Sequence, residues 1–192
     1  DLALVRHPAT GGQSQGSLFI NPGGPGASGV DFVRDSVDFA VSADLQREFD
    51  IVGWDPRGVG RSSAVACYTD PADLDQFIFG IPEAEFGSPE WEPEVTESSV
   101  AFAEACAKNT GPLLEFVDTN STVSDLDMMR AIVGDARLNY FGYSYGTDIG
   151  ARYADRFPEK VGRLVLDGAT DPTTTTFEVV LAPSEGFEHA LR

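Results

Sequence analysis

The sequence has 192 residues, of which 42% are apolar and 10% aromatic, a composition that suits one compact domain with its own core. Its 13 basic and 31 acidic residues give a formal net charge of −18, and a field of that sign repels phosphate backbones and anionic membranes. We therefore expect no nucleic-acid partner. No apolar run approaches the roughly 18 residues of a membrane helix, and no signal peptide opens the sequence, so we also expect no membrane span.

The first half of the sequence alternates strand, loop, helix and strand. Short apolar runs over residues 2–5, 18–20 and 51–54 are typical of buried strands, and Gly, Pro or polar residues follow each of them. Residues 30–40 carry apolar side chains at helical spacing. This alternation favours an α/β fold with a mostly parallel sheet flanked by helices.

The middle of the sequence breaks this pattern. Over residues 64–95 Pro, Asp and Glu dominate and the aromatic residues are isolated, so we expect an irregular excursion over the surface. A helix is predicted over residues 96–108. A second helix is predicted to begin at Thr122, where Asp125 three residues later makes an acidic variant of the capping box.

The two cysteines, Cys67 and Cys106, are too few for a zinc cage and do not form a CxxC pair. They are either buried thiols or the two halves of one disulfide. Polar and acidic residues surround both, and strong acidity suits a secreted protein, which favours the disulfide and an oxidising compartment. Because His7 and His189 are far apart in the sequence, no ligand cluster is evident, and we expect neither a metal nor another cofactor.

The strongest chemical signal is the pentapeptide GYSYG, which places Ser144 between Gly142 and Gly146. A nucleophile on a tight strand-to-helix turn needs small neighbours on both sides, because the backbone folds back on itself there. An apolar strand over residues 138–141 runs into the motif, and a helix with small residues on its sheet-facing side leaves it. The context favours a nucleophilic serine over the alternative, a glycine-rich turn with an ordinary serine.

A second candidate is the loop over residues 21–29, NPGGPGASG. Acyl transfer needs backbone N–H groups aimed at the developing oxyanion, and a glycine-rich loop lets the main chain come close. One donor usually follows the nucleophile, which is Tyr145 here, and the other comes from a loop after an earlier strand. Since proline has no N–H, the available donors in the loop are glycines, and we favour Gly24.

The same loop also has a rival interpretation as a dinucleotide-binding turn. Residues 24–29 satisfy the GxGxxG pattern between a strand and a helix, and Asp55 at the end of the next strand could bind the ribose. However, Pro25 removes an amide from the turn, and Asp55 leads into Pro56 and not into a helix. The cofactor interpretation also leaves the serine motif unexplained, so we favour the hydrolase.

Four segments together resemble a known family, the secreted actinobacterial tripeptidyl aminopeptidases, which are α/β-hydrolases near the proline iminopeptidases. The resemblance implies that Ser144 is the nucleophile, that the glycine loop and Tyr145 form the oxyanion hole, and that substrates are peptides with a free amino end. It also supports a disulfide between Cys67 and Cys106. One departure is Asp148, where relatives carry an uncharged residue. The matching segments, in family order, are 21–29 (NPGGPGASG), 53–62 (GWDPRGVGRS), 141–147 (FGYSYGT) and 166–172 (LDGATDP).

A serine hydrolase also needs a base and an acid, in the chain order Ser, Asp or Glu, His. Ser144, Asp167 or Asp171, and His189 obey that order. Only one further strand, over residues 161–166, can be read after the serine, and the fold's histidine follows the last strand of the sheet. We therefore interpret His189 as a surface residue and Asp167 and Asp171 as turn or cap residues.

The sequence is consequently interpreted as the amino-terminal half of a serine peptidase, an α/β-hydrolase fold incomplete at its carboxyl end. Residues 1–170 would form the hydrolase core and residues 171–192, with a short helical pattern between Pro183 and Arg192, the start of an inserted lid. The edge strand would pair with a complementary carboxyl-terminal chain of the same enzyme. The alternatives are a catalytically inactive binding or assembly fragment and a carboxylesterase. We expect a secreted or cell-surface protein.

Overall fold

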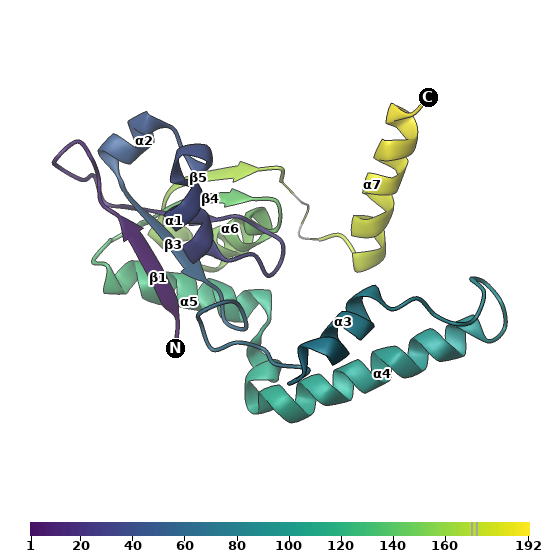
Figure 1. Cartoon of the computed structure of the whole chain (residues 1–192). Helices are drawn as coiled ribbons and strands as arrows, with labels where there is room; N and C mark the ends of the chain where they lie inside the picture. Colours follow the sequence, from purple (N-terminus) through teal and green to yellow (C-terminus); the bar gives the residue numbers. More distant parts are fainter. Residues whose placement is uncertain (170, 172) are drawn as a thin grey trace.

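A five-stranded sheet with the strand order β1-β3-β2-β4-β5 organises the computed structural model, which describes residues 1–169, 171 and 173–192 (Figure 1). β1 is antiparallel to β3, and the other neighbours are parallel. The carboxyl ends of four parallel strands therefore meet at one edge of the sheet, where loops can bring side chains together. The strands are β1 (Ala3–His7), β2 (Ser17–Asn21), β3 (Asp50–Asp55), β4 (Leu138–Tyr143) and β5 (Val161–Asp167).

Helices cover both faces of the sheet and enclose two cores. Because successive side chains of a strand point to opposite faces, Phe19 of β2 packs in the core with α5 (Thr119–Ile132) and α6 (Tyr145–Arg156). Leu18 and Ile20 pack in the opposite core with α1 (Gly29–Ala40). Two short elements, α2 (Ala43–Glu48) and the 3₁₀ helix η2 (Pro158–Lys160), complete the connections.

The five strands and the helix over residues 30–40 are confirmed, but the prediction for residues 64–95 is wrong. That region contains α3 (Pro71–Phe79) and the start of α4 (Trp91–Thr110). The local start signal of α3 is Asp70, whose carboxylate accepts a hydrogen bond from the Ala72 amide, followed by Pro71 in the first turn. The helix predicted over residues 96–108 is confirmed within α4. The sequence hides α3 and the first five residues of α4 because neither helix carries a wide apolar face: α3 has no buried residue and α4 buries Cys106 alone.

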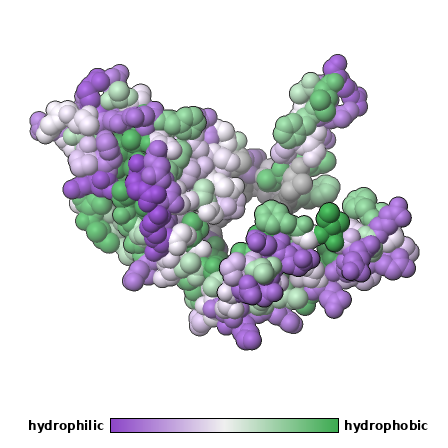
Figure 2. Space-filling model, viewed as in Figure 1, coloured by the Kyte–Doolittle hydropathy of each residue, from purple (hydrophilic) through white to green (hydrophobic). Residues whose placement is uncertain are grey.

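Residues 64–117, called the arm below, extend away from the sheet (Figure 1). The arm holds α3, α4 and the 3₁₀ helix η1 (Gly111–Phe116), and neither core includes an arm residue among those described. Its surface mixes hydrophilic and hydrophobic residues (Figure 2). Between α3 and α4 lies a groove of about 680 Å³ whose walls include Tyr68, Phe77 and Glu94. The arm's most exposed large apolar side chains are Ile78, Phe79, Ile81 and Phe86.

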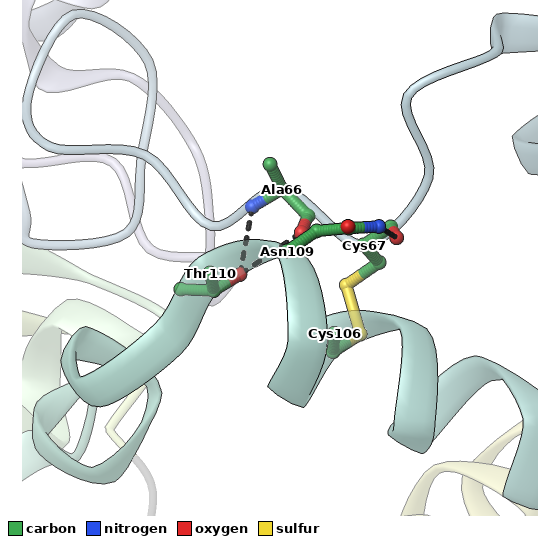
Figure 3. The surroundings of a disulfide bond; sticks show 5 residues. All are labelled: Ala66, Cys67, Cys106, Asn109 and Thr110. Atoms are coloured by element: carbon green, nitrogen blue, oxygen red, sulfur yellow. Dashed lines mark hydrogen bonds between the residues drawn. A yellow bond between two sulfur atoms is a disulfide. The ribbon is translucent and has the colours of Figure 1, made fainter.

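A disulfide between Cys67 and Cys106 closes the base of the arm (Figure 3). Two hydrogen-bonded contacts lie beside it. Asn109 donates from its side chain to the Cys67 carbonyl at 2.6 Å, and the Thr110 hydroxyl both accepts from the Ala66 amide and donates to the Ala66 carbonyl at 3.0 Å. The end of α4 is thus attached to the start of the arm by a covalent bond and three hydrogen bonds.

Removing the disulfide with the double variant Cys67→Ala/Cys106→Ala should open the arm. Closing a loop of 39 residues is worth roughly 2–4 kcal/mol, and the loss should be local because the arm does not share the cores. Limited proteolysis should cut the variant within residues 64–117 at least tenfold faster than the parent chain. Cleavage that starts equally fast in β2 or β4 would contradict this.

Two further helix boundaries differ from the prediction. α5 begins at Thr119, three residues early, because Asp118 caps it by accepting from the Ser121 amide at 3.0 Å. Asp125, predicted as part of a capping box, lies inside the helix and forms a two-bond ion pair with Arg57 at 2.6 and 2.7 Å. The cluster of Asp, Thr and Ser residues before α5 offers several local caps, and the Arg57 contact needs tertiary structure.

The helix predicted near the carboxyl end is also longer than expected. α7 (Thr176–Ala190) begins with a capping box between Thr175 and Glu178, and Pro183 lies inside the helix. Asp171 accepts from the Thr173 and Thr174 amides, as a turn residue does. Thr170 and Pro172 lie outside the described residues, and the domain boundary there stays a prediction. No described helix has the length and hydropathy needed to cross a bilayer.

A partly buried ionic cluster joins α5, α6 and η2. The Asp127 carboxylate accepts hydrogen bonds from Arg130 at 2.9 Å, Lys160 at 2.7 Å and Tyr153 at 3.0 Å. Burial alone would raise the pKa of Asp127, but the three donors outweigh it, so the pKa lies below its ordinary value.

Acid should therefore weaken the fold through Asp127. A carboxyl group whose pKa is lowered by folding contributes its full stabilisation above its unfolded pKa of about 4 and loses it as pH falls through the lower folded value. The free energy of unfolding in urea should be smaller at pH 3 than at pH 6, and Asp127→Asn should reduce that difference. Asp44→Asn, which changes an exposed carboxylate paired with Arg47, is the control. Equal acid sensitivity of the two variants would refute the assignment.

Candidate active site

Ser144 lies at a sharp turn between β4 and α6, with an unusual backbone conformation. Its φ is 49° and ψ −121°, and it is the one non-glycine residue with positive φ in the described part of the chain. Such a conformation costs about 1–3 kcal/mol and persists only where surrounding structure enforces it. The Ser144 amide donates to the Asp167 carbonyl at 2.9 Å, and the Ser144 carbonyl accepts from the Thr147 amide at 2.8 Å. The residue is exposed, as a nucleophile must be.

The two glycines of the motif make room for other backbone segments, as predicted. A Cβ on Gly142 would lie 2.3 Å from the Gly146 carbonyl oxygen, and a Cβ on Gly146 would lie 2.9 Å from the Asn21 carbonyl oxygen. Gly168 after β5 also approaches the turn, because its Cβ position is 3.8 Å from the Ser144 nitrogen. Backbone segments thus pack closely around the turn, and side chains at these glycine positions would collide with them.

Gly142→Ala should therefore destabilise the fold, by about 1–3 kcal/mol or more, since an inserted methyl group must displace backbone and not a flexible side chain. Gly186→Ala is the matched control: its Cβ would meet nothing within 4 Å, and Ala in place of Gly stabilises a helix by about 1 kcal/mol. Chemical unfolding measures both. A Gly142→Ala chain as stable as the parent would show that the turn is not constrained in this way.

The loop that joins β2 to α1 faces this turn. A Cβ on Gly23 would lie 2.5 Å from the Tyr143 carbonyl oxygen, 3.0 Å from Ser144 Cβ and 3.2 Å from the Tyr145 nitrogen. The structure therefore brings the glycine loop to Ser144 and Tyr145, which follow it by more than 100 residues in sequence.

Hydrogen bonding separates Gly23 from Gly24 and Gly26, the other two candidate donors of the loop. The Gly23 amide donates to the side-chain oxygen of Asn21 at 2.9 Å, so it is already used. The Gly24 amide finds no acceptor within the described part of the chain, and the Tyr145 amide opens α6, where first-turn N–H groups lack helical partners. The Gly24 and Tyr145 amides therefore have no hydrogen-bond partner in the described residues, as is also true of the Gly26 amide, and their role as oxyanion donors stays a prediction.

Sequence analysis did not assign a role to Asn21, which the structure places at the centre of this arrangement. Asn21 ends β2 with 1% of its surface exposed, accepts from Gly23 and packs against Gly146. A usable signal was present, because an Asn that ends a buried strand and precedes Pro-Gly is typical of a side chain that hydrogen-bonds to its own turn.

Asp55 is not available to a ribose. Its side chain is fully buried at the end of β3, with both carboxylate oxygens accepting hydrogen bonds from Ser28, Val30 and Arg61. Burial alone would raise the pKa of Asp55, but these hydrogen bonds and the Arg61 charge outweigh it, and the pKa is lowered. The acidic residue that the dinucleotide hypothesis required is therefore buried and already hydrogen-bonded within the chain, so it cannot bind a ribose.

The three-residue set of Ser144, Asp167 and His189 is not assembled. Asp167 ends β5 and contacts the turn through its carbonyl oxygen, which accepts from Ser144. His189 lies in the last turn of α7, which projects away from the sheet (Figure 1), and it lines a surface hollow with Glu185, Glu188 and Arg192. No contact joins His189 to Ser144 or Asp167 in the described residues.

Other polar groups near the turn hold α6 in place. The Tyr145 hydroxyl lies 2.9 Å from the Thr119 hydroxyl, and burial raises the pKa of Tyr145. Asp148, the departure from the resembling family, accepts from Arg152 at 2.8 Å one helical turn later. No group of three or more His, Cys, Asp or Glu in the described residues is arranged to hold a metal ion.

A parallel sheet, an exposed serine on a strained strand-to-helix turn and a facing glycine loop define the class of hydrolases with a nucleophile elbow. The chain belongs to the α/β-hydrolase fold family, whose profile matches residues 16–192. BpoC of Mycobacterium tuberculosis H37Rv shares the fold, with a TM-score of 0.53 and 15% identity over all of this chain and 50% of BpoC.

Curated relatives with hydrolase names match most of the chain. The serine protease Hip1 of Mycobacterium tuberculosis H37Rv is 41% identical over 98% of this chain and 36% of its own length. The tripeptidyl aminopeptidase of Streptomyces coelicolor is 40% identical over 90% of this chain and 32% of its own length. Carboxylesterase B of Mycobacterium tuberculosis H37Rv is 42% identical over 98% of this chain and 36% of its own length. The chain is thus a hydrolase-family chain that spans about a third of these relatives.

Proposed function

We propose that the chain carries the nucleophile and oxyanion hole of a serine peptidase of the aminopeptidase type, which releases short peptides from free amino ends. The observation that carries this proposal is the exposed Ser144 at a positive φ, facing the glycine loop at the carboxyl edge of the sheet. An ordinary surface serine needs no such conformation, whereas the sharp turn exposes the hydroxyl of a nucleophilic serine at the edge of the sheet.

In this mechanism the Ser144 hydroxyl oxygen attacks the carbonyl carbon of the substrate while a base removes its proton. The carbonyl oxygen becomes an oxyanion that accepts hydrogen bonds from the Gly24 and Tyr145 amides. The intermediate then expels the amine, which takes up a proton, and leaves an ester on Ser144 that water hydrolyses. The Tyr145 amide lies at the amino end of α6, where the helix dipole also favours negative charge.

The base and acid are proposed to come from a further stretch of the same enzyme, either continuous with this chain or a complementary carboxyl-terminal chain. Residues 171–192 would then begin the lid. In support, β5 is an edge of the sheet in the described residues, and Val165 on it is 50% exposed. Strand edges with apolar residues pair readily with another strand.

We further propose a secreted or cell-surface location. The Cys67–Cys106 disulfide supports it, because such bonds persist in oxidising compartments and are rare in the cytosol.

A fluorophosphonate probe tests the proposed nucleophile. The probe should label Ser144 in the presence of the complementary polypeptide, and Ser144→Ala should abolish labelling. Ser124→Ala is the matched control, since Ser124 is a half-buried serine on α5 whose hydroxyl donates to the Asn120 carbonyl. Absence of labelling in every context would favour the alternative, a non-catalytic binding or assembly fragment.

The relative named carboxylesterase B favours a second candidate, an esterase, because the elbow geometry serves ester and amide cleavage alike. Rates on a tripeptide anilide and on a short-chain ester distinguish the two. The aminopeptidase proposal expects kcat/KM on the anilide with a free amino end to exceed that on its amino-blocked form by at least tenfold. Equal rates on both forms, with faster ester cleavage, would support the esterase.

A further inference from the structure

A buried carboxylate links the two loops at the carboxyl edge of the sheet. One oxygen of Asp55 accepts from the Ser28 hydroxyl at 2.5 Å and from the Val30 amide at 3.1 Å. The other accepts from the Arg61 amide at 2.8 Å. Ser28 ends the glycine loop and Arg61 belongs to the loop after β3, so Asp55 holds both segments against the end of β3.

Close backbone packing brings the start of α1 against the end of β3. A Cβ on Gly29 would lie 2.2 Å from the Trp54 carbonyl oxygen, and a Cβ on Gly53 would lie 2.1 Å from the Gly29 carbonyl oxygen. The first turn of α1 therefore lies directly on β3, main chain against main chain. Val33 of α1 packs beside Gly53 in the core, and the hydrogen bonds of Asp55 add a polar attachment at the amino end of the helix.

The proposed oxyanion donor lies between two anchors. At one end of the loop Asn21 accepts from the Gly23 amide, and at the other end Ser28 donates to Asp55. Between them the chain turns tightly, with the Cβ position of Gly24 only 2.8 Å from the Gly26 nitrogen. Because Gly24 and Gly26 both have positive φ and no side chain, the direction of the Gly24 amide depends on where the two ends are held.

We propose that Asp55, acting through Ser28, is a positioning residue that aims the Gly24 amide at the oxyanion formed on Ser144. The proposal rests on the proposed function of Ser144 for its catalytic part, and on the loop geometry alone for its structural part. It separates two roles of Ser28: its hydroxyl caps α1 by accepting from the Asp31 amide, and it also donates to Asp55.

The test compares two serine caps. Ser28→Ala removes both the cap of α1 and the link to Asp55, whereas Ser42→Ala removes the cap of α2, where Ser42 accepts from the Leu45 amide and contacts no carboxylate. Ser42→Ala should lose a cap-sized amount of stability, and Ser28→Ala should lose more, because it also removes a hydrogen bond to the buried Asp55 carboxylate; thermal unfolding measures both. Ser28→Thr, which keeps the hydroxyl, should behave like the parent chain.

The first readout is independent of catalysis. In the 192-residue chain, the NMR order parameter of the Gly24 amide should fall in Ser28→Ala from a rigid value of about 0.85 towards about 0.6. It should stay unchanged in Ser42→Ala. An unchanged Gly24 order parameter in Ser28→Ala overturns the proposal, whether or not Ser144 reacts.

The second readout is the rate of fluorophosphonate labelling, under conditions in which the parent chain is labelled. Because removing one oxyanion donor costs roughly 10²–10³ in rate, a misaimed Gly24 amide should slow labelling by at least about tenfold in Ser28→Ala and less than about twofold in Ser42→Ala and Ser28→Thr. Equal slowing in the two alanine variants overturns the positioning role. If the parent chain is never labelled but the Gly24 order parameter falls in Ser28→Ala, the proposed function of Ser144 is wrong and the structural role of Asp55 and Ser28 is retained.

Discussion

The backbone conformation of Ser144 is the constraint on which the rest of the site depends. A positive φ at a residue with a Cβ is unfavourable, so neighbouring segments must hold it. They do so at close range: Gly142 admits the Gly146 carbonyl, and Gly23 lies against the Tyr143 carbonyl and Ser144. The same closeness that enforces the turn also brings a second loop within reach of it. The same backbone contacts therefore hold Ser144 in its strained conformation and place the glycine loop beside it.

Polar side chains buried at the sheet edge turn this packing into a defined geometry. Asn21 ends β2 and Asp55 ends β3, and each accepts hydrogen bonds from the loop between them. Buried polar groups are stabilising only when their hydrogen bonds are made, and both side chains have partners. A site built from glycine-rich loops thus obtains its order from two fixed acceptors on strands and not from packing of its own side chains.

The arm follows a different design. It carries eleven acidic residues and one basic residue, so much of the chain's negative charge is concentrated there. It shares neither hydrophobic core, and like charges within it repel. The disulfide and three hydrogen bonds at its base offset this weakness. The arm is therefore expected to depend on these contacts at its base and not on the cores of the sheet.

Local patterns in the sequence determined the strands, the turn at Ser144 and the glycine loop, because apolar runs and glycine positions report short-range geometry. They failed for α3 and the first residues of α4, helices that lack a wide buried face, and for the start of α5, where several residues could cap. The burial of Asp55, its hydrogen bond with Ser28 and the close approach of Gly23 to Ser144 were decided by tertiary structure alone. The physical reason is that each depends on which backbone segments meet across the sheet edge, and residues far apart in sequence carry no local signal of that meeting.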